Sequence, residues 1–261
     1  MKKYFLAKNV RRLVSLVACS VVLFSTQLEA APASKAQAER ITSAIQEALG
    51  SSGVKVLSVD KVEFIDGLFE VAVSHNNSKK LIYSNVSGSH FILGDLLESK
   101  SMANLTQAKV EKLNAIDFDK ELPSGLALKS VAGTGSRKIA VFEDPNCGYC
   151  KRFRRETLSK VQDLTVYTYV FPMLGKDSLD KAQKVMCADN KAKVWEDWMM
   201  KDQAPTGSGG CNAPINQLIE LGRGLGVTGT PTIFFQDGTR VSGAILPAEL
   251  HRRIAVASRP Q

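Results

Sequence analysis

Two cysteines separated by two residues, in Cys147-Gly148-Tyr149-Cys150, constrain the fold of this chain more than any other feature. An apolar, buried-type strand is predicted at residues 139–142, a turn at 144–146, and a helix from the cysteines to about residue 161. This order places Cys147 at a helix N-terminus, where unpaired backbone N–H groups and the helix dipole favour a thiolate. We therefore expect Cys147 to be the nucleophile.

Basic side chains follow the motif and would lower the pKa of Cys147 further. They are Lys151, Arg152, Arg154 and Arg155. Cys150 lies one helical turn further in and should be more buried, so its expected role is to resolve a mixed disulfide by attacking Cys147. Gly148 would keep the approach to the sulfur open, and Tyr149 would offer an apolar face beside it.

An inert disulfide is the alternative for this pair. Structural disulfides usually close longer loops, because the entropic stabilisation grows with loop length. The strand before the motif and the helix after it are the context that a redox pair requires. The local pattern therefore favours a redox-active pair.

The N-terminus has the order of a secretory signal peptide. Five basic residues lie within the first twelve positions, residues 13–24 are mostly apolar, and small residues surround Ala30 and Ala33. The apolar run is shorter than the roughly 20 residues that a spanning helix needs, so an uncleaved anchor fits less well. Cleavage after Ala30 or after Ala33 fits the pattern. Lipidation of Cys19 is a weaker alternative, because this cysteine lies inside the apolar run.

Export bears on both the charge and the cysteine count. Removing residues 1–33 takes away five basic residues and one acidic residue, which lowers the formal net charge from +8 to +4. No long basic run remains of the kind that binds nucleic acid. Four cysteines remain in an oxidising compartment, which favours disulfides. They allow three pairings, of which Cys147 with Cys150 and Cys187 with Cys211 is the natural one.

A zinc site is the rival interpretation of the cysteines. The spacing of Cys187 and Cys211 is not that of a zinc knuckle, and the three histidines, at positions 75, 90 and 251, are scattered. We therefore expect no metal and no cofactor.

The region after the signal reads as a small helix-plus-antiparallel-sheet unit. An amphipathic helix is predicted at 36–49, ended by Gly50 and Gly53. Turn residues at 66–67 and 76–78 separate the predicted strands. These strands are residues 54–57, 61–65, 68–73 and 80–83. So small a unit buries little surface alone and often needs a partner.

The rest of the chain reads as a connector and an α/β domain. A helix is predicted at 104–118 and is broken by Pro123-Ser124-Gly125. The strand at 139–142, the helix after it and a strand at 164–171 imply a right-handed parallel crossover. Later elements complete the domain. They are a helical stretch at 178–225 interrupted at 207–211, strands at 232–235 and 239–242 joined by an Asp-Gly turn, and a helix from Pro247.

A second motif, Gly229-Thr230-Pro231-Thr232, immediately precedes a predicted strand. A proline that enters a strand often marks special backbone geometry, including a cis peptide bond. Taken alone, the motif favours an ordinary trans proline. Beside a domain with a Cys-x-x-Cys motif we expect a cis bond, on the strength of the resemblance described next.

The strand at 140–142, the Cys-Gly-Tyr-Cys motif, the long helical stretch and Gly229-Thr230-Pro231 resemble the thioredoxin superfamily. The chain is more closely similar to the DsbC/DsbG family, in which DsbG usually carries Pro in place of Gly148. The resemblance covers nearly the whole mature chain. It implies an α+β small N-terminal dimerisation domain, a linker helix, and an α/β thioredoxin-like catalytic domain with a helical insertion.

The resemblance also implies domain boundaries. A signal peptide would occupy residues 1–33, with cleavage near 30–33, and the N-terminal dimerisation domain residues 34–98. The linker helix and connector would occupy 99–130, and the catalytic domain 131–261.

Site residues and partners follow from the resemblance as expectations. Cys147 and Cys150 would be catalytic, with active-site support from Gly148, Tyr149, Thr230 and cis-Pro231. Thr230 and Pro231 would hold an unfolded substrate strand beside Cys147. Cys187 and Cys211 would form a structural disulfide. The protein would be a periplasmic homodimer that acts on misfolded disulfide-containing exported proteins and is kept reduced by the membrane reductant DsbD.

The sequence departs from the family pattern at two positions. Thioredoxin has a buried carboxylate six residues before its first cysteine, and this chain has Val141 there, so proton transfer for Cys150 needs water, Glu143 or Asp144. Lys151 stands where His is familiar.

The function expected from these features is disulfide isomerisation through a mixed disulfide at Cys147. The alternatives are a DsbG-like chaperone or thiol reductase that shelters unfolded chains, and a periplasmic dithiol oxidase.

Overall fold

The computed structural model describes residues 32–75 and 78–258. The predicted signal peptide, Cys19 and the predicted turn residues Asn76 and Asn77 lie outside these residues, apart from the last two signal positions, Pro32 and Ala33. Within the described part of the chain, no helix is both long enough and apolar enough to span a membrane.

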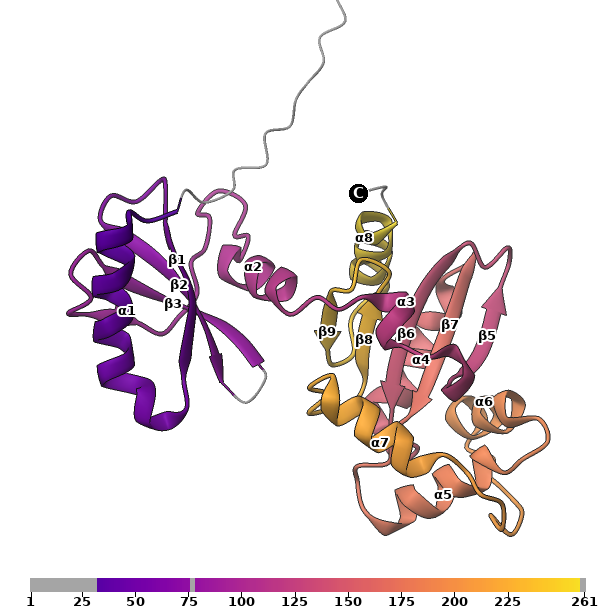
Figure 1. Cartoon of the computed structure of the whole chain (residues 1–261). Coiled ribbons are helices and arrows are strands. Elements are labelled where there is room, and N and C mark those ends of the chain that lie inside the picture. Colours follow the sequence, from indigo (N-terminus) through magenta and orange to yellow (C-terminus); the bar gives the residue numbers. More distant parts are fainter. Residues whose placement is uncertain (1–31, 76–77, 259–261) are drawn as a thin grey trace, which may run out of the picture.

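The N-terminal unit is a helix on an antiparallel sheet, as the sequence predicts, and the sheet has four strands, the last of which was not predicted (Figure 1). Helix α1 (Lys35–Leu49) begins at Ser34, whose hydroxyl accepts a bond from the backbone N–H of Gln37 in a capping box. Its buried residues Ile41 and Ile45 pack on the sheet and form the core of this unit. A short 3-10 turn, η1 (Gly50–Ser52), follows.

The strands of this sheet are arranged in chain order, β1-β2-β3-β4. They are β1 (Lys55–Lys61), β2 (Leu68–His75), β3 (Ser78–Asn85) and β4 (Phe91–Ile92). The prediction of a strand at 61–65 was wrong, because residues 63–66 form the turn between β1 and β2. The chain has to reverse there for the two strands to pair, and Gly67 has the positive φ that such a turn requires. Phe64 is therefore exposed instead of paired.

A linker connects this unit to the second one. Helix α2 (Leu105–Leu113) is shorter than the predicted helix at 104–118, because Asn114 ends it and bonds the backbone of Lys79 through its side chain. α3 (Phe118–Glu121) and η2 (Ser124–Leu126) complete the linker. Figure 1 shows α2 between the two sheets. Tyr83 and Thr106 share a 2.5 Å hydrogen bond on one side of α2, and Glu111 pairs with Arg253 on the other.

The second unit contains a five-stranded sheet with the order β5-β7-β6-β8-β9. Its strands are β5 (Leu128–Ala132), β6 (Arg137–Glu143), β7 (Leu164–Val170), β8 (Thr232–Phe235) and β9 (Arg240–Ser242). β6 and β7 are parallel, which confirms the predicted crossover, and the other pairs are antiparallel. Sequence analysis missed β5, an edge strand whose residues after Leu128 are exposed and carry little hydrophobic signal.

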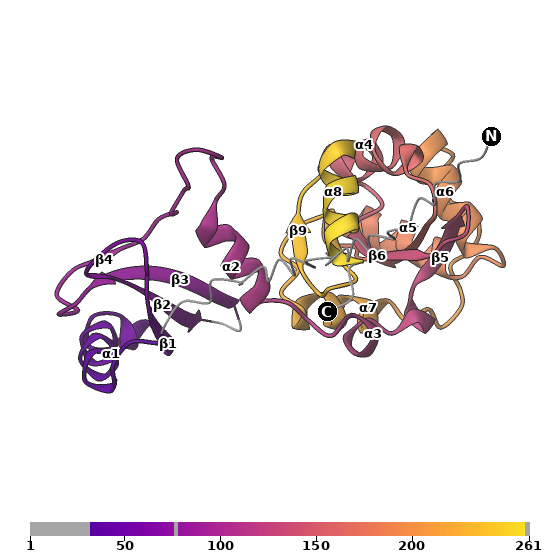
Figure 2. The same cartoon turned by 90° about the horizontal axis from the view of Figure 1, so that it is seen from above.

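Helices cover both faces of this sheet (Figure 2). α4 (Gly148–Glu156) and α8 (Pro247–Ala257) pack on one face through Phe153, Leu250 and Ile254. Residues of α3, α5 (Lys176–Met186), α6 (Lys191–Lys201) and α7 (Ile215–Gly224) join the core on the other. The predicted helix to residue 161 is α4 followed by the 3-10 turn η3 (Leu158–Lys160). The helices cover the faces of the sheet but not the carboxyl ends of β6 and β7. The Cys-x-x-Cys motif follows the carboxyl end of β6.

Candidate active site

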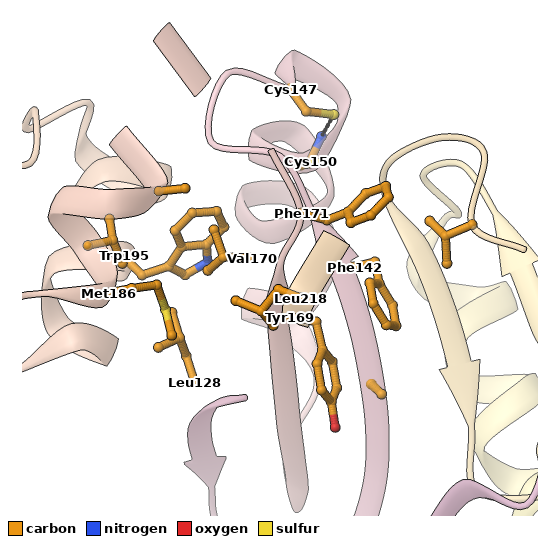
Figure 3. Packing of buried hydrophobic residues seen from close by; sticks show 14 of the residues in the cluster. Leu128, Phe142, Cys147, Cys150, Tyr169, Val170, Phe171, Met186, Trp195 and Leu218 are labelled. Carbon is orange, nitrogen blue, oxygen red and sulfur yellow. Dashed lines mark hydrogen bonds between the residues drawn. The ribbon is translucent and has the colours of Figure 1, made fainter. Parts of the chain in front are cut away.

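Cys147 is the N-cap residue of α4, four residues after the end of β6. The chain turns between them, and the backbone N–H of Cys147 donates to the carbonyl oxygen of Asp144 at 3.1 Å. The Sγ atom of Cys147 accepts a hydrogen bond from the backbone N–H of Cys150, also at 3.1 Å (Figure 3). A sulfur thus takes the place of the hydroxyl or carboxylate that usually caps a helix, and this interaction favours the thiolate over the thiol.

The two cysteines of the motif have pKa values that move in opposite directions. Hydrogen bonds lower the pKa of Cys147 from 9.0 to about 6. The largest contribution comes from the side chain of Cys150, and smaller ones come from Thr230 and from the backbone of Cys150. Burial raises the pKa of Cys150 strongly, and its side chain is fully inaccessible. The pair therefore combines a thiol that is ionised at neutral pH with one that stays protonated until something removes its proton.

The second sequence motif lies against the first. The Thr230-Pro231 peptide bond is cis, and β8 starts at the next residue. The Sγ atom of Cys147 lies 3.3 Å from the carbonyl oxygen of Thr230, a distance at which its thiol form donates a hydrogen bond. Residues 83 positions apart in the sequence thus form one surface, in which Tyr149 is 63% exposed. A Cβ at Gly148 would meet no atom within 4 Å, so the motif is open on this side.

The basic residues after the motif do not act as the sequence predicts. Lys151 and Arg155 both pair with Asp202, and Arg154 pairs with Glu143. The guanidinium group of Arg152 lies 5.0 Å from the centre of the Tyr149 ring. These cations are paired with carboxylates and aromatic rings, so they do not set the pKa of Cys147. Hydrogen bonds lower that pKa instead. The sequence shows that cations follow the motif but does not show what neutralises them.

Glu143 is a fully buried carboxylate at the end of β6. Its Oε2 atom accepts bonds from Nε and the Nη2 atom of Arg154 at 2.8 and 2.6 Å, whereas Oε1 accepts none from Arg154. Burial raises the pKa of this carboxyl group against the opposing effects of Arg154 and, to a smaller extent, of a hydrogen bond from the Trp195 side chain. Glu143 is close enough to both thiols for its charge to raise their pKa values. It is therefore a buried base close to a buried acid, the Cys150 thiol.

Asp144, the next residue, is also fully buried but is completely satisfied. Its carboxylate accepts hydrogen bonds from the backbone N–H groups of Asn146, Met173 and Leu174 and from the hydroxyl of Ser178, at 2.6 to 2.9 Å. Sequence analysis named Asp144 only as a turn former and as a proton route. The four donors leave its oxygens no free position, so of the two carboxylates only Glu143 has an oxygen available to receive a proton.

Sequence analysis missed Trp198 of α6. Its indole N–H donates to the carbonyl oxygen of Pro145 at 2.6 Å, and the ammonium group of Lys151 lies 3.5 Å from its ring centre. The helical insertion thus holds the loop before Cys147. No local pattern in the sequence connects this tryptophan to residues some fifty positions earlier.

The other two cysteines lie outside this site. Cys187 and Cys211 form a disulfide whose Cα atoms are 5.5 Å apart, and it joins the end of α5 to the segment before α7. Among residues 32–75 and 78–258, no three side chains of His, Cys, Asp or Glu gather in a way that could hold a metal ion.

Comparisons with known proteins give the same two-part organisation. Residues 29–107 match the family described as the disulfide bond isomerase protein N-terminal domain, and residues 125–257 match a thioredoxin-like domain. The chain is 44% identical over 202 residues to the probable thiol:disulfide interchange protein DsbC of Bordetella parapertussis, covering 77% of this chain and 69% of that one. The chain belongs to the DsbC family. The predicted family and fold class are therefore confirmed.

More distant relatives agree with this family. The DsbC of Escherichia coli K12 is 30% identical over 214 residues, covering 79% of this chain and 84% of that one. A crystal structure of a disulfide interchange protein from Neisseria gonorrhoeae matches 53% of this chain and all of its own length, with a TM-score of 0.50 and 37% identity. This member of the DsbC family is a thiol–disulfide exchange enzyme.

Proposed function

We propose that this enzyme is a periplasmic isomerase that reshuffles wrong disulfides in exported proteins, with Cys147 as the nucleophile. The observation that carries the proposal is the contrast between the two thiols of one motif. The pKa of Cys147 is lowered to about 6 beside the cis Thr230-Pro231 bond, whereas Cys150 is buried and its pKa is raised. An ionised nucleophile beside a protonated reserve thiol suits repeated attack on foreign disulfides.

The first step is the attack of the Cys147 thiolate on a substrate disulfide. A bond forms between Cys147 and one substrate sulfur, the substrate S–S bond breaks, and the other substrate sulfur leaves as a thiolate. A different substrate thiolate then attacks the mixed disulfide and releases Cys147 as a thiolate. The substrate keeps its number of disulfides but changes their pairing, so no net oxidation occurs.

Cys150 provides the exit from a stalled complex. It attacks the Sγ atom of Cys147, the substrate sulfur leaves as a thiolate, and the enzyme keeps the Cys147–Cys150 disulfide. The substrate gains two electrons, so an external reductant has to return the enzyme to its dithiol form; the family resemblance assigns this role to DsbD. This exit requires that Cys150 lose its proton first.

We assign the acceptance of that proton to Glu143. Its raised pKa makes the carboxylate a better base, and Arg154 holds only one of its two oxygens. Asp144 is unsuited to this step because four donors occupy it. Arg154, which binds the other oxygen of Glu143, also lines a surface cavity of about 280 Å³ together with Glu196. Arg154 therefore connects Glu143 to a surface that water reaches.

We further propose that the N-terminal unit forms a homodimer and that the signal peptide directs the chain to the periplasm. Large apolar side chains exposed on the N-terminal unit support the first proposal, because burying them would be favourable. They are Leu57, Phe64, Ile92 and Leu93. The proposed domains remain residues 34–98, 99–130 and 131–261. Light scattering of the purified protein measures the molecular mass and tests the dimer.

Refolding of scrambled ribonuclease tests the catalytic assignment. The enzyme should restore ribonuclease activity, and the Cys147→Ser variant should not. Ribonuclease recovery that persists in this variant would rule out Cys147 as the nucleophile. Thiol trapping in cells separates an isomerase from an oxidase, because the Cys147–Cys150 pair should be mainly reduced in the first case and mainly oxidised in the second.

A further inference from the structure

The segment after β7 leaves the sheet beside the segment that carries Cys147. β6 and β7 are parallel, with Glu143 opposite Val170, and the backbone N–H of Phe171 donates to the carbonyl oxygen of Glu143 at 2.8 Å. Figure 3 shows Phe171 close to the start of α4 and below the two cysteines. Residues 172–175, which follow, therefore lie at the same edge of the sheet as the Cys-x-x-Cys motif.

The carboxylate of Asp144 joins these two segments. Its Oδ1 atom accepts from the N–H of Asn146, the residue before Cys147, at 2.7 Å, and its Oδ2 atom accepts from the N–H groups of Met173 and Leu174 at 2.6 and 2.9 Å. A single carboxylate group thus connects the two segments. Ser178 of α5 donates to the same carboxylate at 2.7 Å. Hydrogen bonds to a charged acceptor are stronger than neutral ones, so the relative position of the segments is firmly fixed.

Met173 and Leu174 expose their side chains although their backbone is held. They are 41% and 55% exposed, whereas the neighbouring Phe171 is buried. A single exposed apolar residue is ordinary, but these two are consecutive, and their N–H groups bind the same buried carboxylate as Asn146, the residue before Cys147. A surface that is already ordered loses little conformational entropy when it binds a ligand.

We propose that Met173 and Leu174 form a ledge that contacts apolar residues flanking the substrate cysteine, and that Asp144 holds this ledge in place relative to Cys147. The occupant is an extended apolar segment of an unfolded polypeptide. The mixed disulfide brings it there, because Asp144 links the ledge to Asn146, the residue before Cys147. The ledge makes the enzyme selective for cysteines that belong in a protein core. This inference rests on the proposed function and specifies its substrates.

The test compares two disulfide-linked peptides, one with Leu and Val beside its cysteine and one with Ser and Gly there. The rate of mixed-disulfide formation at Cys147 gives kcat/KM for each peptide. The parent enzyme should prefer the apolar peptide, and in the Met173→Ser/Leu174→Ser double variant this preference should fall about tenfold, in proportion to the apolar area removed. The matched control is Val131→Ser, since Val131 is 55% exposed but lies opposite Thr165, at the far end of β7. Its preference should equal that of the parent.

Asp144 is tested as a positioning residue through the same preference. Asp144→Asn replaces one acceptor oxygen by a donor and should reduce the preference as the ledge variant does. Circular dichroism shows whether Asp144→Asn folds. If it does not, Ser178→Ala, which removes one of the four donors to Asp144, takes its place and should reduce the preference by a smaller amount. An unchanged preference in the double variant would overturn the ledge. A parent enzyme that forms no mixed disulfide with either peptide would instead overturn the proposed function.

Discussion

Of the two cysteine pairs in the catalytic unit, one forms a disulfide and the other consists of free thiols, and solvent exposure does not explain the difference. Cys187 and Cys211 form a disulfide although Cys211 is exposed and Cys187 is half-buried. Cys147 and Cys150 are free thiols although both are buried. The bonded pair connects the end of one helix to a distant segment, whereas the free pair occupies the first turn of one helix.

The difference teaches that the place of a sulfur in the fold, rather than its solvent access, distinguishes the free pair from the bonded one. The Sγ atom of Cys147 is held by the backbone N–H of Cys150 and lies against Thr230. In the other pair, the sulfur of Cys187 meets the N–H of Cys211 at 3.3 Å, and the bond closes a long loop. The first environment stabilises a thiolate and the second stabilises the fold.

Loss of Cys147 should remove activity, whereas loss of the other pair should not. Cys147→Ser should reduce isomerase activity to background, because a serine hydroxyl is not ionised near neutral pH. The Cys187→Ala/Cys211→Ala variant should keep the parent rate at a temperature where it is folded. Ribonuclease refolding measures both. Equal losses in the two variants would contradict the division between a reactive and a structural pair.

The Cys187–Cys211 disulfide should contribute to stability alone. The chain-entropy estimate for a loop of this length gives about 3–4 kcal/mol. The Cys187→Ala/Cys211→Ala variant should lose this amount of unfolding free energy. Urea denaturation measures it, provided that the dependence of the unfolding free energy on urea concentration is fitted for each protein separately. The pKa of Cys147, followed by thiolate absorbance, should stay the same. A changed pKa would mean that the second pair also supports the reactive site.

Glu143→Gln should slow the resolving step by roughly 100-fold, the size of a typical general-base contribution. Formation of the mixed disulfide by Cys147 should stay fast, so the complex should accumulate in a rapid-mixing experiment. The matched control is Glu196→Gln, because Glu196 also contacts Arg154 but is half exposed. The Glu143→Gln variant should also lose about 3 kcal/mol of stability, since Arg154 would be left without its buried partner.

The reaction of Cys147 should depend on pH with a midpoint at about 6. Its alkylation rate should rise through that pH and level off above it. Because the pKa of Cys147 is lower in the folded state than the ordinary 9.0, the thiolate stabilises the folded, reduced protein. This contribution is complete above pH 9 and is lost as the pH falls through about 6. An alkylation midpoint near 9 would contradict the hydrogen-bonded thiolate.

The alternation of strand, turn and helix around residues 139–171 predicted the parallel crossover correctly, because buried strands and amphipathic helices have distinct hydrophobic periods. The errors lie where tertiary contacts override local preference. The run at 61–65 has the composition of a strand but forms a turn, since the chain has to reverse to pair β1 with β2. The edge strand β5 is exposed along most of its length, and only its pairing with β7 makes it a strand.

The candidate site divides in the same way. Cys147-Gly148-Tyr149-Cys150 is a local motif, so the sequence alone placed its first thiol at a helix N-terminus, as the structure confirms. The four cations after it were visible in the sequence, but the carboxylates that pair with Lys151, Arg154 and Arg155 were not. Trp198 and Asp144 act across contacts that span about thirty to fifty positions, and no periodicity encodes such contacts.

The sequence by itself determined which residues are chemically able to react, because side-chain type and short spacing are local properties. The tertiary structure decided how they react. It brought Thr230 to Cys147, buried Glu143 against Arg154 and bound the backbone N–H groups of Met173 and Leu174 to Asp144. The physical reason is that pKa values depend on burial and on the partners within a few ångströms. Those partners are chosen by the packing of the sheet and its helices rather than by neighbours in the chain.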